Sequence, residues 1–252
     1  MFYEVHGEGP PLLHLSGGTC SNEVGFEDIA ALAKNFQVIA PEQMGHGRTA
    51  DDTARPFDYH DMAEDVVALL RHLKLDGAMV FGFSDGGILG LDMAIHHPEL
   101  VSKLAVSGTN FSTAGLEEAT SEWFRTTTGD GWPRVLRDSY DRLSPDGPDH
   151  WNDLIERIKT MWLSQPDYTP EQLATITAPT LVIAGDHDAI TPEHTVAMFK
   201  AIPNARLCIV PKAGHGVVPA ETVTAFLLEP ATQERRSAEG RSLQDGGRDQ
   251  HA

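Results

Sequence analysis

Short apolar runs recur along the chain and alternate with segments of helical length. Six runs bounded by Gly, Pro or polar residues have the pattern of buried strands: PPLLHLS, FQVIAPE, GAMVFGF, VSKLAVSG, PTLVIAGD and ARLCIVPK. Helix-length segments such as DMAEDVVALLRHLKL and GGILGLDMAIHH lie between most of them. Buried strands joined by crossover helices predict an α/β fold with a mostly parallel sheet flanked by helices.

The alternation breaks over residues 111–170, where helical periodicity continues without a convincing strand. In DHWNDLIERIKTMWLSQ the apolar positions follow the three-four spacing of one buried helix face: Trp151, Leu154, Ile155, Ile158 and Trp162. We therefore expect a helical cap insertion at 111–170 in an α/β core made of residues 1–110 and 171–230.

Aromatic residues are concentrated in this insertion. It contains all four tryptophans of the chain: Trp123, Trp132, Trp151 and Trp162. They either build the small core of the insertion or line a ligand cleft, and both interpretations stay open. In the second case, Trp123 and Trp162 are the candidates for contact with a substrate.

The C-terminal segment, residues 231–252, has many charges, few apolar residues and no period, so we expect it to be disordered. It contains four Arg, two Glu and two Asp, which cancel, so the net charge of −18 belongs to the rest of the 252 residues. Such a charge repels phosphate backbones and anionic lipid surfaces, which argues against nucleic-acid and membrane partners.

The chain shows no sign of export. The N-terminal segment lacks the pattern of a signal peptide, and no run of apolar residues is long enough to span a bilayer. Cys20 and Cys208 are the two cysteines, far apart and without metal-type spacing, so no disulfide framework is indicated. We expect a soluble cytoplasmic protein of undetermined oligomeric state.

A serine occupies a sharp turn between a predicted strand and a predicted helix. Gly82-Phe83-Ser84-Asp85-Gly86 fits the pattern G-x-S-x-G, in which glycines let strand and helix approach closely around a nucleophile. The other interpretation of the pattern is an ordinary glycine turn. The strand-to-helix context favours the nucleophile.

A serine nucleophile needs a histidine as base and a carboxylate to orient that histidine. The next two predicted strands end in GDHD, which contains Asp186 and Asp188, and in a loop that holds His215. Because carboxyl ends of parallel strands lie at one edge of a sheet, we expect Ser84, Asp188 and His215 to form a triad. Asp186 is expected to bond to nearby backbone groups instead.

The remaining histidines could bind a metal ion, lie in solvent or form local hydrogen bonds. A metal site formed by Asp186, His187 and Asp188 is disfavoured because adjacent residues rarely converge on one ion, and no second ligand cluster is apparent. Solvent exposure or local hydrogen bonding is expected for the remaining candidates, namely His46, His60, His72, His96, His97 and His187. The prediction is therefore that no metal or other cofactor is required.

Acyl transfer also requires N–H donors for the oxyanion of the tetrahedral intermediate. One normally follows the nucleophile, and the other lies in the loop after an early strand. These positions predict the backbone N–H groups of Asp85 and of Gly18 in SGGT. A plain glycine turn explains Gly17 and Gly18 equally well when they are taken alone.

The chain resembles the α/β-hydrolase superfamily over residues 2–228. The segment from PPLLHLSGGT to PEQMGHGRT resembles its early strands and oxyanion loop, and GFSDGG, GDHDAITP and AGHG match its nucleophile, acid and histidine motifs. Ser16, Glu42 and Met44 depart from the usual His, Asp and Arg, which affects the expected support of the oxyanion loop. The family's first strand is not apparent, so we expect a short sheet edge or a truncated chain.

Within the superfamily, the segment GFSDGGILGLDMAIHHPELVSKLAVSGTN is similar to the valacyclovir hydrolase (biphenyl hydrolase-like) group. In that group, the acid beside the serine is associated with binding a substrate amino group. A carboxylate about 6 Å from an oxyanion repels it by about 3 kcal/mol at a dielectric near 20. The Asp85 side chain therefore either turns to the helix N-terminus or water, or binds a substrate ammonium.

These observations favour a serine hydrolase that cleaves a small carboxylic ester, with an amide or a thioester as variants. A carbon–carbon bond hydrolase with the same triad is one alternative. A ligand receptor of the same fold with slow turnover is the other. The partner is a small molecule in each case.

Overall fold

The computed structural model describes residues 1–230, so the tail expected at 231–252 lies outside the described residues. Its sheet has seven strands, and all neighbouring pairs are parallel except the first, β1 with β3. In sheet order the strands are β1 (Tyr3–His6), β3 (Gln37–Pro41), β2 (Pro11–Leu15), β4 (Ala78–Phe83), β5 (Val101–Ser107), β6 (Thr180–His187) and β7 (Ala205–Gly214). The mostly parallel sheet is confirmed.

Strand β1 was not among the six strands that the pattern predicts. It has four residues, none of them fully buried, and it pairs with β3 at the edge of the sheet. A strand this short and this exposed has no apolar run to distinguish it from a loop. The edge of the sheet is therefore short.

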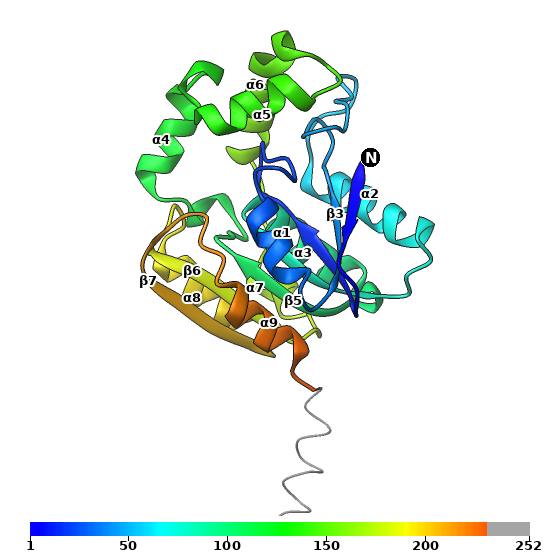
Figure 1. Cartoon of the computed structure of the whole chain (residues 1–252). Helices are drawn as coiled ribbons and strands as arrows, with labels where there is room; N and C mark the ends of the chain where they lie inside the picture. Colours follow the sequence, from blue (N-terminus) through cyan, green and yellow to red (C-terminus); the bar gives the residue numbers. More distant parts are fainter. Residues whose placement is uncertain (231–252) are drawn as a thin grey trace, which may run out of the picture.

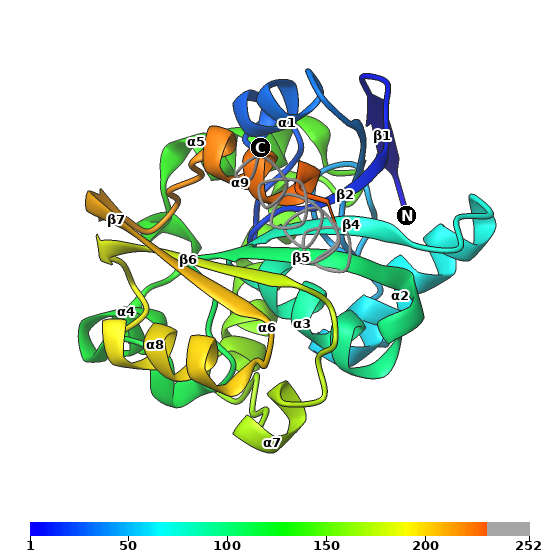
Figure 2. The same ribbon diagram turned by 90° about the horizontal axis from the view of Figure 1, so that it is seen from below.

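The five inner strands, β3, β2, β4, β5 and β6, are mainly buried because helices cover both faces of the sheet. The edge strand β7 forms as predicted but contains no fully buried residue, so the expectation that ARLCIVPK is a buried strand is wrong. Successive residues point to opposite sides, so Leu13 and Val80 pack into one hydrophobic core, and Leu12 and Phe81 pack into the other. Helices α1 (Phe26–Leu32) and α9 (Ala220–Leu228) cover one face. Helices α2 (Tyr59–His72), α3 (Asp85–His96), α7 (Pro170–Leu173) and α8 (Pro192–Ala201) cover the other (Figure 2).

Residues 111–170 add no strand to the sheet and contain three helices. These are α4 (Glu118–Thr126), α5 (Arg134–Leu143) and α6 (Trp151–Trp162), which gather beyond one end of the sheet (Figure 1). The predicted apolar face of α6 is confirmed, since its five residues are all buried. Asp51 of the core, with its side chain 1% exposed, accepts hydrogen bonds from His150 and Arg157 and so ties this segment down.

Within residues 1–230, no helix has both the length and the apolar character needed to cross a bilayer.

The position of Phe81 gives a test of the packing. Its ring is fully buried between the sheet and helices α1 and α9, so Phe81→Ala should lower the free energy of unfolding by about 3–5 kcal/mol. The control is Val5→Ala, on the edge strand and 47% exposed, which should cost below about 1 kcal/mol. Urea denaturation followed by circular dichroism measures both, and equal losses would contradict this assignment of the core.

Candidate active site

Ser84 lies on the predicted strand-to-helix turn, between the end of β4 and the start of α3. Its φ is 52° and its ψ is −120°, a conformation that is strained for any residue with a side chain. The Ser84 N–H donates to the carbonyl of Ser107 on β5, at 2.8 Å. The neighbouring strand thus helps to hold the turn.

Two glycines make the turn possible. A Cβ at Gly86 would lie 2.0 Å from the carbonyl oxygen of Leu15, at the end of β2. A Cβ at Gly82 would lie 2.3 Å from the carbonyl oxygen of Gly86. Both contacts are with backbone atoms that cannot move independently, so the close approach that the sequence pattern predicted has a steric cause.

The three residues of the predicted triad lie in hydrogen-bond contact. His215 Nε2 is 3.1 Å from Ser84 Oγ, and His215 Nδ1 is 2.7 Å from Asp188 Oδ1. This geometry fits the tautomer in which Nδ1–H donates to Asp188 and Nε2 accepts from the serine hydroxyl. Ser84, Asp188 and His215 come from the loops or ends of β4, β6 and β7, at one edge of the sheet.

Asp188, not Asp186, contacts the histidine. The side chain of Asp188 is fully buried and also accepts from the backbone N–H groups of Gly185 and Ile190. Burial alone would raise its pKa, yet the bonds with His215 and the backbone hold the pKa of Asp188 below its usual value. Asp186 accepts from the N–H of Ala213, as expected of a residue bonded to nearby backbone.

The predicted oxyanion donors, Gly18 and Asp85, both line the cavity in front of Ser84. Asp85 is the first residue of α3, so its N–H has no partner within the helix. Gly18 follows β2, and a Cβ there would lie 2.4 Å from the Trp162 ring and 2.5 Å from Asp85 Oδ2. Gly18 therefore allows a close approach to both side chains, which a plain turn would not require.

The cavity has a volume of about 470 Å³ and is mainly apolar. Three of the four tryptophans line it, among them the predicted Trp123 and Trp162, together with Trp132. Trp132 lies 4.7 Å from Trp123 and 5.4 Å from Trp162, measured between ring centroids. Trp151 is fully buried inside the helical segment instead. Three tryptophans thus line a cavity and one builds the core of the insertion, and contact of Trp123 and Trp162 with a substrate stays a prediction.

The Asp85 carboxylate faces this cavity, and the residue is only 6% exposed. The Tyr59 hydroxyl donates to Oδ1 at 2.9 Å, and Trp162 Nε1–H donates to Oδ2 at 2.8 Å. Burial raises the pKa of Asp85, against the opposing effect of these bonds. The side chain therefore does not turn to water, which was one of the alternatives, because two neutral donors hold it inside.

Glu42, which stands where the superfamily usually has Asp, supports the loop after β2. Its side chain is 1% exposed, and it accepts from the backbone N–H of Asn22 at 2.9 Å and from the guanidinium of Arg48. Burial opposes ionisation, but the bonds with Arg48 and Asn22 hold the pKa of Glu42 below its usual value. The ionised Glu42 side chain, bonded to Arg48 and to the backbone of Asn22, thus acts as a charged anchor for this loop.

Sequence reasoning missed several residues of the cavity. Tyr59 is the main one, because nothing in the sequence shows that the start of α2 reaches Asp85 on α3. Phe124 and Cys20 also line the cavity, and burial raises the pKa of the Cys20 thiol to about 12. Outside the cavity, the described residues contain one potential metal-binding cluster, His60, Asp92 and His96, and it does not include Asp188.

Comparison with known proteins agrees with this architecture. Residues 5–226 match the family described as the alpha/beta hydrolase family. "Putative carbamate hydrolase RutD" of Serratia proteamaculans (strain 568) is 28% identical over 251 residues, which cover 88% of this chain and 91% of the relative. The human "Serine hydrolase BPHL" is 28% identical over 231 residues, which cover 86% of this chain and 77% of the relative.

Solved structures show the same fold. A mutant of the meta-cleavage product hydrolase CumD from Pseudomonas fluorescens IP01 superposes with a TM-score of 0.76 at 20% identity, covering 89% of this chain and 93% of that chain. The enol-lactonase from Burkholderia xenovorans LB400 superposes with a TM-score of 0.71 at 24% identity. The match covers 90% of this chain and 96% of that chain.

The charged anchor at Glu42 generates a pH-dependent prediction. A lowered folded pKa stabilises the protein above the unfolded pKa, about 4.3 for Glu, and this stabilisation is lost as pH falls through the folded value. Glu42→Gln should lower the free energy of unfolding at pH 7 by about 1–3 kcal/mol. It should also reduce the loss of stability between neutral and acidic pH.

Urea denaturation at several pH values measures both effects. The control is Glu8→Gln, an exposed position, which should match the wild type at each pH. A Glu42→Gln curve parallel to that of the wild type would contradict the role of this anchor.

Proposed function

Because the chain belongs to the alpha/beta hydrolase family, we propose that it is a serine hydrolase that cleaves a small carboxylic ester through an acyl-enzyme on Ser84. The observation that carries this proposal is the continuous hydrogen-bonded chain from Ser84 through His215 to Asp188. Its reactive end opens into the aromatic cavity, where a small organic substrate fits.

In the first half of the reaction, Ser84 Oγ attacks the ester carbonyl carbon while His215 Nε2 takes the hydroxyl proton. The negative charge moves to the carbonyl oxygen, which accepts from the N–H groups of Gly18 and Asp85. The carbon–oxygen bond to the alcohol then breaks, and His215 gives its proton to the departing alkoxide. Asp188 stabilises the imidazolium that exists between these two proton transfers.

In the second half, water attacks the acyl-enzyme and His215 Nε2 takes a proton from it. The same two N–H groups stabilise the second tetrahedral intermediate. When that intermediate collapses, the proton returns to Ser84 Oγ and the carboxylic acid is released. This cycle uses only the side chains and backbone of this protein and one water molecule, and it requires no metal or other cofactor.

The Asp85 carboxylate suggests which esters are preferred. Among the residues of 1–230 that line the cavity, none is Lys or Arg, so the protein supplies no strong cation to the buried carboxylate. A substrate ammonium would neutralise it, remove its repulsion of the oxyanion, and lie in a cavity lined by the rings of Trp123 and Trp132. We therefore assign a primary or secondary amine to the preferred ester.

Three other kinds of activity fit the same triad and are compared in the tests below: hydrolysis of another acyl bond, cleavage of a carbon–carbon bond, and ligand binding with slow turnover. Hydrolysis of an amide or a thioester would follow the same scheme. A carbamate is a further candidate substrate, because the RutD relatives are named putative carbamate hydrolases. Carbon–carbon bond cleavage is the second candidate, since CumD is named a meta-cleavage product hydrolase. A slow-turnover receptor is the third. A cytoplasmic location stays a prediction from the sequence.

Ser84 is the proposed nucleophile, and its removal tests the proposed function. Ser84→Ala should lower kcat/KM for a chromogenic short-chain ester by about 10⁴-fold or more, because no other group near the carbonyl can form the acyl-enzyme. A fluorophosphonate probe should label the wild type at Ser84 and leave the variant unlabelled. Retained turnover, or a folded wild type that resists the probe, would instead point to a binding role.

A further prediction concerns Asp85. The wild type should hydrolyse an α-amino acid ester faster than its deaminated analogue, and Asp85→Asn should reduce that ratio of kcat/KM values about tenfold or more. Asparagine keeps the backbone N–H and the side-chain oxygen, so activity on the deaminated ester is the internal control. If the wild type has no preference, or the variant keeps it, the amine assignment is wrong while the triad assignment stands.

A further inference from the structure

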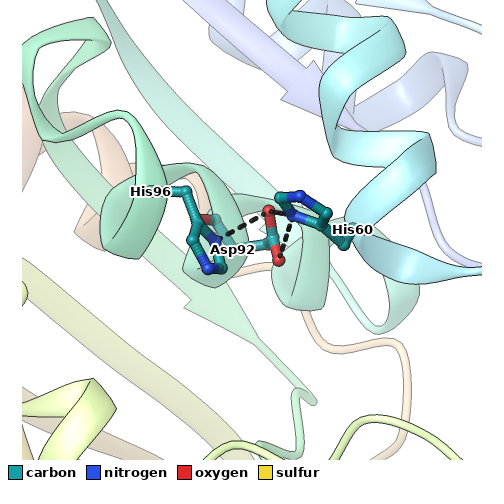
Figure 3. Close-up of side chains that lie close together, drawn as sticks. All are labelled: His60, Asp92 and His96. Carbon is teal, nitrogen blue, oxygen red and sulfur yellow. Dashed lines mark hydrogen bonds and ion pairs between the residues drawn. The ribbon is translucent and has the colours of Figure 1, made fainter.

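A second polar cluster lies outside the active-site cavity, between helices α2 and α3. It consists of His60 near the start of α2 and of Asp92 and His96 on α3, with the two imidazoles on either side of the carboxylate (Figure 3). Asp92 and His96 are four residues apart, so they share one face of the helix. The mechanism of ester hydrolysis uses none of the three.

The burial of these groups is unequal. The Asp92 side chain is fully buried, whereas the side chains of His60 and His96 are 50% and 38% exposed. A carboxylate removed from water needs compensating charge or several hydrogen bonds. Within residues 1–230, the ion-pair partners of Asp92 are these two imidazoles, with no Lys or Arg.

Two of the three distances between the ligand atoms match those around a metal ion. His60 Nδ1 is 3.1 Å from Asp92 Oδ1, and His96 Nδ1 is 3.3 Å from the same oxygen. A tetrahedral zinc ion with ligand bonds of 2.0–2.2 Å separates neighbouring ligand atoms by about 3.3 Å. The three ligand atoms lie within 4.8 Å of one another, and the two partly exposed rings have room to turn toward a shared ion.

A neighbouring residue fixes the carboxylate. The Tyr168 hydroxyl donates to Asp92 Oδ2 at 2.7 Å, which orients the other oxygen toward the imidazoles. Such outer hydrogen bonds commonly orient the carboxylates that bind metal ions. Beside the cluster lies a separate cavity of about 290 Å³, lined by all three residues and by Asp58, Asp167 and Tyr168. It leaves space for water ligands and adds negative charge that attracts a cation.

We propose that His60, Asp92 and His96 bind one Zn²⁺ ion, with water completing the coordination. Two imidazole nitrogens and one carboxylate oxygen favour zinc and similar transition metals over Mg²⁺ or Ca²⁺, which prefer oxygen ligands. The bound ion links the first turn of α2 to α3. Those two helices also carry Tyr59 and Asp85, so the site joins the elements that form one wall of the active-site cavity.

The test is titration of untagged, EDTA-treated full-length protein with ZnCl₂, followed by calorimetry and by thermal unfolding. One equivalent of Zn²⁺ should bind and raise Tm, because an ion that binds only the folded state stabilises it. His60→Ala and His96→Ala should each weaken binding at least tenfold, about 1.4 kcal/mol. Tyr168→Phe, which removes only the hydroxyl, should weaken binding by about tenfold.

The matched control is His72→Ala, an exposed histidine on the same helix as His60, which should bind Zn²⁺ like the wild type. Circular dichroism of each variant without metal shows whether it is folded. If a histidine variant is not folded, Tyr168→Phe still tests the site, because it removes only one hydroxyl. Absence of saturable binding by the wild type below about 100 µM Zn²⁺ overturns the proposal. So does equal binding by the wild type, His60→Ala and His96→Ala.

Discussion

The contact between Gly86 and the carbonyl of Leu15 is the constraint on which the candidate site depends. No side chain fits there, since even a Cβ would lie 2.0 Å from that oxygen. Because the first turn of α3 is pressed against the end of β2, the loop after β2 lies beside the serine turn. Gly18 therefore lies close to Asp85, as the proposed oxyanion site requires. The positive φ of Ser84 is held in place by the packing around it.

This close packing encloses a carboxylate beside the nucleophile, and the proposed substrate ammonium is the simplest means of neutralising it. The residue after the serine must supply an N–H group, but here its side chain is a carboxylate enclosed with the reacting atoms. Tyr59 and Trp162 satisfy its hydrogen bonds without neutralising it. Burial raises its pKa, so the site favours either a proton on Asp85 or an external cation. Both remove the repulsion, but only the cation adds recognition of a particular ligand.

The sequence predicted most of the sheet and the residues of the triad, because both follow local rules. Each of the six predicted strands is an apolar run, although β7 lies at the edge of the sheet and is not buried. Ser84, Asp188 and His215 follow strand ends, which parallel topology brings to one edge. The contact of Tyr59 with Asp85 has no such rule, since it depends on how α2 docks against α3. The cluster of His60, Asp92 and His96 was missed for the same reason. The sequence shows only that Asp92 and His96 are four residues apart on one predicted helix.

Helix α3 presents two buried carboxylates, Asp85 and Asp92, seven residues and so about two turns apart on one face. Adjacent residues of α2 contact them, Tyr59 the first and His60 the second. Each carboxylate also accepts from an aromatic residue at or after the end of α6, either Trp162 or Tyr168. The first is enclosed by aromatic rings, which suits an organic ammonium. The second is flanked by partly exposed imidazoles, which suits a metal ion. One packing arrangement thus accounts for both proposed cation sites, which differ in chemistry.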